Sequence, residues 1–174
     1  MPKLTQVKET KRGRYALFFD GEFAFSLDED TFAMAGLHTG DELEEWQIHD
    51  LQTKSDTRKA VDKAMDLLAL RDHAAGELYQ KLCRSFDPHS AAAAVAKMQE
   101  LNLLDDAGFA RRRAAELLRK RKSRRAILDD LHAKGIDRGA AAEAVEALFA
   151  QSEEDEEENP ELANARALVE RHYA

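Results

Sequence analysis

The chain resembles itself at a spacing of about 50 residues, which strongly limits the folds that it can adopt. A third copy begins near Ala165. Each full copy contains three short helical patterns, and repeats of this length are typical of helical arrays whose units bury their apolar faces on one another. Such arrays usually bind extended partners and rarely catalyse. The matched pairs at this offset include Ala64 with Ala114, Leu67 with Leu117, Leu68 with Leu118, Asp87 with Asp137 and Val95 with Val145.

The first 54 residues lie outside the repeats and predict a small subdomain that contains strands. Two apolar runs, Tyr15–Phe19 and Glu22–Leu27, flank Asp20-Gly21, and this dipeptide supplies the two positive φ angles of a type I′ hairpin turn. A third strand is predicted over Leu4–Glu9. A two-residue turn should produce one apolar face with two cross-strand pairs, Phe18 with Phe23 and Ala16 with Phe25.

Helix is predicted for the rest of the chain, with Glu42–Leu51 as a first helix that turns Trp46 inward. Asp87 and Asp137 are expected to cap corresponding helices at their starts, and Gly135 to end one. The fold class is therefore mostly α, with tandem three-helix repeats in an elongated array and a small N-terminal antiparallel β-hairpin or β-sheet subdomain. The expected domains are 1–54 (β-hairpin and helix), 55–104 (repeat 1), 105–152 (repeat 2) and 153–174 (an acidic linker over 153–159, then the first helix, Leu162–Tyr173, of a truncated repeat 3).

The net charge of −8 conceals a separation of opposite charges along the chain. Glu153–Glu158 contributes −6, whereas Asp105–Arg125 holds nine Lys or Arg residues against three acids, a local charge of +6. Charge separation of this kind says more about partners than the total does. No apolar run approaches the ~20 residues that span a bilayer, and the start carries no secretory signal. Together with the single cysteine, Cys83, this favours a cytoplasmic protein.

Residues that could support catalysis or metal binding are not arranged for it. Asp105-Asp106 and Asp129-Asp130 are adjacent in sequence, so their side chains do not face each other on a helix, and helix capping is the simpler interpretation of the first pair. The six histidines lack the spacing of metal ligands, and no glycine-rich loop is present. We therefore expect no catalytic, cofactor-binding or metal-binding residues and no enzyme activity.

The candidate site lies in the basic segment, Asp105–Arg125. On a helical wheel its buried stripe leaves Arg112 and Arg119 pointing outward, and a solvated face with local pairs such as Glu116 with Lys120 is the simpler alternative. The next helix begins with two arginines beside the positive end of its dipole, where each cation costs ~0.3–1 kcal/mol. Local rules tend to be broken where function requires it. The predicted contacts to an anionic partner are Arg111, Arg112, Arg119, Lys120, Arg121, Lys122, Arg124 and Arg125.

Several motifs, in their order and spacing, resemble the RecX family of RecA regulators. Leu104-Asp105-Asp106 is followed by Phe109-Ala110, Lys122-Ser123, Ile127, Leu131 and Lys134-Gly135-Ile136. Glu77-Leu78-Tyr79-Gln80-Lys81-Leu82 is similar to the family's repeated Glu-Leu-x-x-Lys-Leu element, and the Asp20-Gly21 hairpin looks like the extension of Gram-positive members. The resemblance covers nearly the whole chain.

The resemblance implies tandem three-helix repeats and binding to the RecA–single-stranded DNA filament. It also implies a non-enzymatic regulator that modulates, usually inhibits, RecA in DNA repair, recombination and the SOS response. Single-stranded DNA is a further expected partner, a membrane is not, and a monomer is expected. The alternative is a stand-alone nucleic-acid-binding helical module that acts without RecA. A hydrolytic enzyme is a distant third interpretation, against which the missing site chemistry argues.

Overall fold

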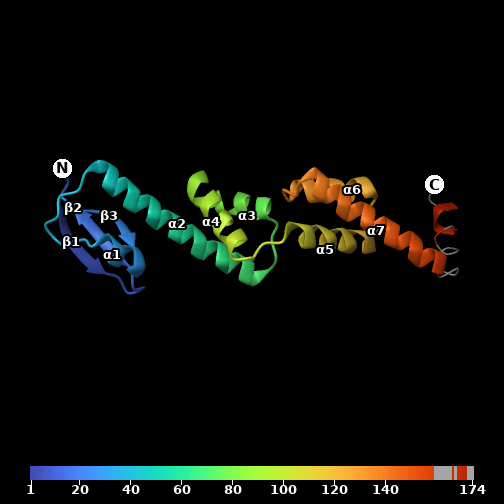
Figure 1. The fold of residues 1–174 in the computed structure, drawn as a ribbon, viewed down its shortest axis with the longest axis horizontal. Coiled ribbons are helices and arrows are strands. Elements are labelled where there is room, and N and C mark those ends of the chain that lie inside the picture. Colours follow the sequence, from blue (N-terminus) through green and yellow to red (C-terminus); the bar gives the residue numbers. More distant parts are fainter. Residues whose placement is uncertain (159–165, 167, 172–174) are drawn as a thin grey trace. The chain divides into compact units, whose positions relative to one another are not determined.

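A computed structural model of the chain describes residues 1–158, 166 and 168–171. The described residues are mostly helical, and a three-stranded antiparallel sheet lies at the N-terminus (Figure 1), which confirms the predicted fold class at this level. The chain divides into two compact units. Unit 1 comprises Met1–Arg71 and Leu78–Leu103, and unit 2 comprises Asp72–Glu77 and Leu104–Ala174. The division into sequence repeats stays a prediction.

The elements follow one another in the order that Figure 1 labels. The strands are β1 (Leu4–Glu9), β2 (Tyr15–Phe19) and β3 (Glu22–Leu27), and the helices are α1 (Glu29–Ala35), α2 (Glu45–Leu70), α3 (Ala75–Leu82), α4 (Pro88–Glu100), α5 (Asp106–Arg119), α6 (Arg124–Ala133) and α7 (Arg138–Glu158).

The β2–β3 hairpin has the turn that its sequence predicts, but its register differs by one residue. Asp20 and Gly21 have φ angles of 51° and 83°, and Phe18 pairs with Phe23 as expected. A bulge then makes Phe25 pair with Leu17, so the predicted pairing with Ala16 is wrong. The shift has a packing reason, because it places Leu17 and Phe25 together in the core of unit 1. Phe23 stays 60% exposed, so the pairs do not share one apolar face.

Helix α2 is longer than predicted because nothing interrupts it. No glycine or proline lies between the predicted helix Glu42–Leu51 and the first helix expected in repeat 1, so one helix runs from Glu45 to Leu70. Its buried positions include Leu51, Ala60 and Ala64, and α4 packs along it. The inward position predicted for Trp46 is wrong, since the side chain is 65% exposed. Leu51 is the residue of this part of α2 that completes the core beneath the sheet.

Helix caps follow the predictions closely. The Asp87 carboxylate accepts a hydrogen bond from the Ser90 amide at 3.1 Å, and Pro88 occupies the first helical position of α4. In unit 2, Asp137 accepts from the Gly139 amide at 3.1 Å, and Gly135 ends α6 with a φ of 81°. The first cap thus sets the start of α4 in unit 1, and the other two set the end of α6 and the start of α7 beside the unit 2 core.

Unit 2 is built from α5, α6 and α7 together with the short segment 72–77. Ala74 is fully buried in the unit 2 core, and the Ala75 amide donates a hydrogen bond to Asp106 at 2.8 Å. Gly76 meets Gly135 so closely that a Cβ on Gly76 would lie 2.8 Å from the Gly135 Cα. Segment 72–77 lies within predicted repeat 1, yet it packs as part of unit 2.

The acidic run after residue 152 is helical in the described residues. The sequence predicts a linker there, whereas α7 continues through Glu158. Glutamate is a strong helix former, and no glycine or proline precedes Pro160 in this stretch. The helix predicted over Leu162–Tyr173 lies mostly outside the described residues. Arg166 and residues 168–171 are described and are helical.

Candidate functional site

The eight cations predicted to contact an anionic partner are all exposed on unit 2. We call this set the basic surface. It consists of Arg111, Arg112, Arg119, Lys120, Arg121, Lys122, Arg124 and Arg125. Since the buried side of α5 is formed by apolar residues such as Ala110, Ala114 and Leu117, the outer side of this helix carries Arg111, Arg112 and Arg119.

Most of the basic surface is concentrated at the turn between α5 and α6. Arg119 is the last residue of α5, Lys120 caps it, and Ser123 caps the start of α6. Arg112 lies two helical turns before Arg119, about 10 Å along the axis at 1.5 Å per residue. Six cations therefore fall within the seven residues from Arg119 to Arg125.

The turn holds Arg121 in an unusual backbone conformation. Its φ is 61°, in the left-handed region that favours glycine. The Arg121 amide donates to the Leu118 carbonyl at 2.9 Å and the Lys122 amide to the Leu117 carbonyl at 3.0 Å, the pattern of a Schellman motif. The motif that ends α6 has Gly135 at the same position. Arg121 therefore occupies a position whose backbone conformation favours glycine.

The start of α6 is capped, and one of its two arginines has a packing role. The Ser123 hydroxyl accepts a hydrogen bond from the Ala126 amide at 3.1 Å. The Arg124 guanidinium lies over the Phe149 ring of α7, 5.0 Å from the centroid, in a cation–π arrangement. A structural contact thus offsets part of the unfavourable placement of Arg124 beside the helix dipole, whereas Arg125 has no such contact among the described residues.

Half of the basic surface is engaged by neighbouring groups of unit 2. Arg112 lies 3.2 Å from Asp72, and Lys120 lies 3.1 Å from Glu116. Arg119 donates to the Ala115 carbonyl at 3.4 Å. The ion pairs are exposed, so they contribute little to stability and leave the cations accessible. Within the described part of the chain, no carboxylate pairs with the remaining arginines or lysine of the turn and of α5, which are Arg111, Arg121, Lys122 and Arg125.

The acids of the same region have structural roles. Asp105 caps α5 by accepting from the Gly108 amide at 3.0 Å, and Asp106 holds the Ala75 amide. The capping interpretation of this pair is confirmed for Asp105. Glu116 accepts a hydrogen bond from Lys120, which lowers the pKa of its carboxyl group. Asp105 and Asp106 lie at the far end of α5, so the turn between α5 and α6 holds six cations with Glu116 beside them, and its local charge is positive.

The position of Asp130 on α6 is explained by a contact with another helix, which the sequence did not reveal. Its position toward the negative end of α6 looks unfavourable, but its carboxylate pairs with Arg113, a half-buried arginine on α5. This contact holds α5 against α6. Of the two arginines beside the positive end of the α6 dipole, Arg124 has a packing contact with Phe149, and Arg125 has none among the described residues. The sequence offers no pattern that identifies the Arg113–Asp130 pair, since 17 residues separate its members.

Two further features, a metal site and a membrane-spanning helix, are absent from the described residues. In residues 1–158, 166 and 168–171, no group of three His, Cys, Asp or Glu side chains could hold a metal ion. No helix within these ranges is both long and apolar enough to cross a bilayer.

Motif residues outside the basic surface serve packing. Leu78 and Leu82 of the Glu-Leu-x-x-Lys-Leu element are buried, as are Ile127 and Leu131 of α6. Glu77 is 6% exposed, with its carboxylate 3.6 Å from the Lys134 ammonium. These motif residues therefore define the fold, whereas Lys122 is the motif residue that belongs to the basic surface.

Several known proteins with similar sequences carry the name "Regulatory protein RecX". No family model matches the chain. "Regulatory protein RecX" of Caldanaerobacter subterraneus subsp. tengcongensis is 27% identical over 151 residues, which cover 86% of this chain and 77% of that protein. The protein of the same name from Lactobacillus gasseri is 30% identical over 171 residues, 97% of this chain and 62% of that protein. The one from Bacillus subtilis is 28% identical over 152 residues, 83% and 56% respectively.

A solved structure shows the same fold. The crystal structure of a regulatory protein RecX superposes with a TM-score of 0.63 at 24% identity, covering 85% of this chain and 74% of that one. The fold is thus that of a RecX-type helical protein. The chain belongs to the RecX family of regulatory proteins. It spans between about half and three quarters of the length of the relatives described above.

Proposed function

We propose that the chain is a non-enzymatic regulator that binds RecA–single-stranded DNA filaments and modulates RecA, with inhibition as the expected direction. The observation that carries the proposal is the set of eight exposed cations on unit 2 of a chain from the RecX family. The family resemblance implies RecA as the partner. A filament offers both DNA phosphates and acidic protein surface to such cations. The proposed setting is cytoplasmic DNA repair, recombination and the SOS response.

The distribution of charge favours a filament over naked DNA. The whole chain carries −8, so its long-range field repels nucleic acid even though the turn between α5 and α6 attracts it. No aromatic side chain belongs to the basic surface, so it offers no platform on which bases could stack. We therefore propose that RecA supplies contacts that DNA alone does not. The second candidate is a nucleic-acid-binding module that acts without RecA. One observation favours it, namely the exposed start of α6.

Binding and activity assays together test the proposal. Labelled single-stranded DNA is titrated with the chain in the presence and absence of RecA and nucleotide, and RecA's ATPase and strand exchange are followed in parallel. We expect much tighter binding when RecA and nucleotide are present, and a change in both activities. Unchanged ATPase and strand exchange at saturating chain would refute the regulator. Equal affinity with and without RecA would support the second candidate.

A charge-reversal pair tests the basic surface itself. Changing Lys122→Glu and Arg125→Glu should weaken filament binding at least tenfold, because neither side chain has an ion-pair partner among the described residues. The matched control is Lys11→Glu with Arg12→Glu, two exposed cations in the β1–β2 turn of unit 1. Equal effects of the two pairs would show that net charge, and not this surface, governs binding.

Salt dependence separates phosphate contacts from protein contacts. If the basic surface touches single-stranded DNA, log affinity should fall linearly with log salt, with a slope of about −0.7 for each phosphate neutralised. Contacts to RecA alone should give a shallower slope that does not change with the length of the DNA. A flat profile would exclude DNA from the interface.

A further inference from the structure

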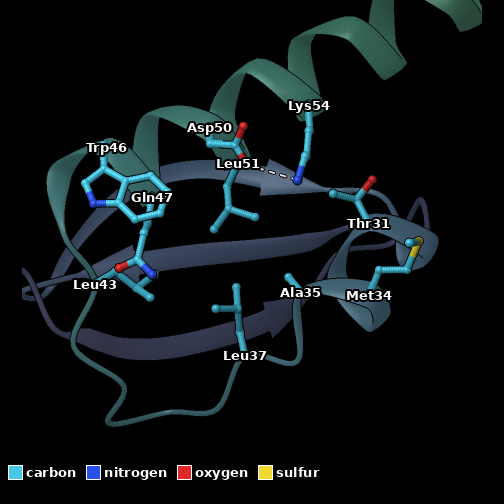
Figure 2. A pocket seen from close by; sticks show the side chains of 10 residues that line it. All are labelled: Thr31, Met34, Ala35, Leu37, Leu43, Trp46, Gln47, Asp50, Leu51 and Lys54. Atoms are coloured by element: carbon cyan, nitrogen blue, oxygen red, sulfur yellow. Dashed lines mark ion pairs between the residues drawn. The ribbon is translucent and has the colours of Figure 1, made fainter.

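Unit 1 contains a pocket that the proposed contact with the filament does not use. It lies between α1, the loop that follows it and the first three turns of α2 (Figure 2), and its volume is about 440 Å³. This is within the range of pockets that accept small molecules or single anchoring side chains. All of its lining residues belong to unit 1, whereas the basic surface belongs to unit 2.

The floor of the pocket is part of the unit 1 core. Leu43 and Leu51 line it and are 9% and 8% exposed, and both pack into the cluster beneath the sheet. Leu37 joins them from the loop. A floor that is held by core packing keeps its shape when a ligand binds, because its side chains have no room to rearrange. The pocket is thus preformed and apolar at its base.

Two large apolar side chains stand at opposite sides of the pocket and are left in water. Figure 2 shows Trp46 of α2 on one side and Met34 of α1 on the other. Trp46 is 65% exposed and Met34 is 90% exposed. The indole N–H of Trp46 donates to Glu44, which holds the ring at the start of α2. Aromatic residues and methionine are enriched at the centres of protein interfaces, where tryptophan is a frequent hot spot.

The segment that builds the pocket is strongly acidic. Residues 29–54 contain seven acids against one lysine, Lys54, and that lysine pairs with Asp50 at 3.0 Å beside the pocket (Figure 2). The net charge of this segment is therefore −6, although Asp50 and Lys54, the two charged residues that line the pocket, offset each other and Asp30 lies 3.9 Å from Arg58. An apolar pocket in such a setting selects against acidic partners by repulsion and favours basic ones. The acids are Glu29, Asp30, Asp41, Glu42, Glu44, Glu45 and Asp50.

From these features we propose that the pocket binds a segment of a partner protein in which one or two bulky apolar side chains are flanked by Lys or Arg. The apolar side chains enter between Trp46 and Met34 and reach Leu43 and Leu51. The flanking cations face the acids of residues 29–54. This surface is a second docking site, independent of the proposed RecA filament contact and opposite to it in charge.

The chain carries its own probe for this proposal. Trp46 is the only tryptophan, so intrinsic fluorescence reports on the pocket directly. The full chain is titrated with a capped 12-residue peptide of lysine and leucine that has leucine at every third or fourth position. We expect a saturable blue shift of the emission. One control peptide replaces leucine by serine and another replaces lysine by glutamate, and each should bind at least tenfold more weakly.

Two pairs of variants at exposed positions then test the apolar pocket and the acids around it. Met34→Ser should weaken binding of the lysine–leucine peptide at least fivefold. Leu70 is 82% exposed at the other end of α2, and Leu70→Ser should leave this binding unchanged. Glu45→Lys should weaken binding, whereas Glu143→Lys on α7 should have little effect. Because all four positions are exposed, the fold should persist, which circular dichroism can verify.

Three results would overturn the proposal. The first is equal binding of the serine or glutamate peptide. The second is binding that is unaffected by Met34→Ser. The third is a dimer of the chain, detected by light scattering, that Met34→Ser dissociates, because a second copy would then be the occupant. None of these results bears on binding to RecA filaments, so failure here leaves the proposed function to its own test.

Discussion

The guanidinium of Arg113 on α5 donates two hydrogen bonds to the carboxylate of Asp130 on α6, from Nε at 2.9 Å and from Nη2 at 3.1 Å. This fork geometry is the strongest arrangement available to an arginine and a carboxylate. It joins the two helices that carry the basic surface, and both side chains are 27% exposed. The hydrogen bond from Arg113 holds the pKa of Asp130 below its ordinary value of 3.8.

Removing the charge of Asp130 should therefore lower stability in a pH-dependent way. Because the folded-state pKa lies below the unfolded one, the contribution is complete above the ordinary aspartate pKa and is lost as pH falls through the folded value. At pH 7, Asp130→Asn should reduce the free energy of unfolding by about 1–3 kcal/mol. Urea titrations at several pH values measure this, and the difference from the parent chain should shrink below the ordinary value of 3.8.

The neighbouring acid supplies the control for that measurement. Asp129 is exposed and also lies toward the negative end of α6, so Asp129→Asn should leave stability unchanged or raise it by a few tenths of a kcal/mol. Equal losses for the two variants would contradict a specific role of the Arg113–Asp130 pair.

Replacing Arg121 by glycine should stabilise the chain and weaken its binding. Glycine adopts the φ of 61° without the penalty of ~1–2 kcal/mol that other residues meet in the left-handed region. Arg121→Gly should thus raise the free energy of unfolding by about 1 kcal/mol, measured by thermal or urea denaturation. Binding to the anionic partner should weaken because a cation is lost.

Lys122→Gly is the matched variant at the same turn. It removes the same charge at a residue whose φ is not in the left-handed region, so it should weaken binding without raising stability. If Arg121→Gly proved destabilising, the side chain would have a structural role in the turn. If it stabilised the fold and left affinity intact, Arg121 would not belong to the site.

The contact between Gly76 and Gly135 should tolerate no side chain. A Cβ on Gly135 would lie 2.7 Å from the Gly76 Cα, and the φ of Gly135 is 81°. Gly135→Ala therefore combines a backbone clash with conformational strain, and we expect a loss of at least about 2–3 kcal/mol in the free energy of unfolding. Differential scanning calorimetry measures the change.

Gly36 separates these two effects. Its φ is 60°, and a Cβ there would meet no atom within 4 Å, so Gly36→Ala carries the strain alone. It should cost about 1–2 kcal/mol. Similar losses at Gly36 and Gly135 would mean that segment 72–77 does not press against the end of α6 in solution.

The two arginines that open α6 should differ in their effect on stability. Arg125→Glu places an acid beside the positive end of the helix dipole and should raise stability by about 0.3–1 kcal/mol. Arg124→Glu gains the same favourable interaction with the dipole but loses the contact with the Phe149 ring, whose centroid lies 5.0 Å from the guanidinium. Its net effect on stability should therefore be near zero or negative. Thermal denaturation of the two single variants at low salt measures the difference. A larger gain for Arg124→Glu would show that the cation–π contact is not formed.

Local features of this fold could be predicted from the sequence alone. The hairpin turn at Asp20-Gly21, the cap at Asp87 and the end of α6 at Gly135 each depend on the φ angles and hydrogen bonds of residues within about four positions of one another. The exposure of the basic surface also followed from its position opposite an apolar stripe. Whether those cations bind a partner stays a prediction.

Only the tertiary structure decided which residues meet across longer separations. The bulge that pairs Leu17 with Phe25, the exposure of Trp46, and the pairing of Arg113 with Asp130 all depend on packing between elements. Segment 72–77 joins unit 2 for the same reason, because glycines 59 residues apart allow two backbones to touch. A periodic pattern specifies which face of a helix is apolar. The partner of that face is chosen by close packing and the pairing of buried polar groups, which neighbouring residues in the sequence do not determine.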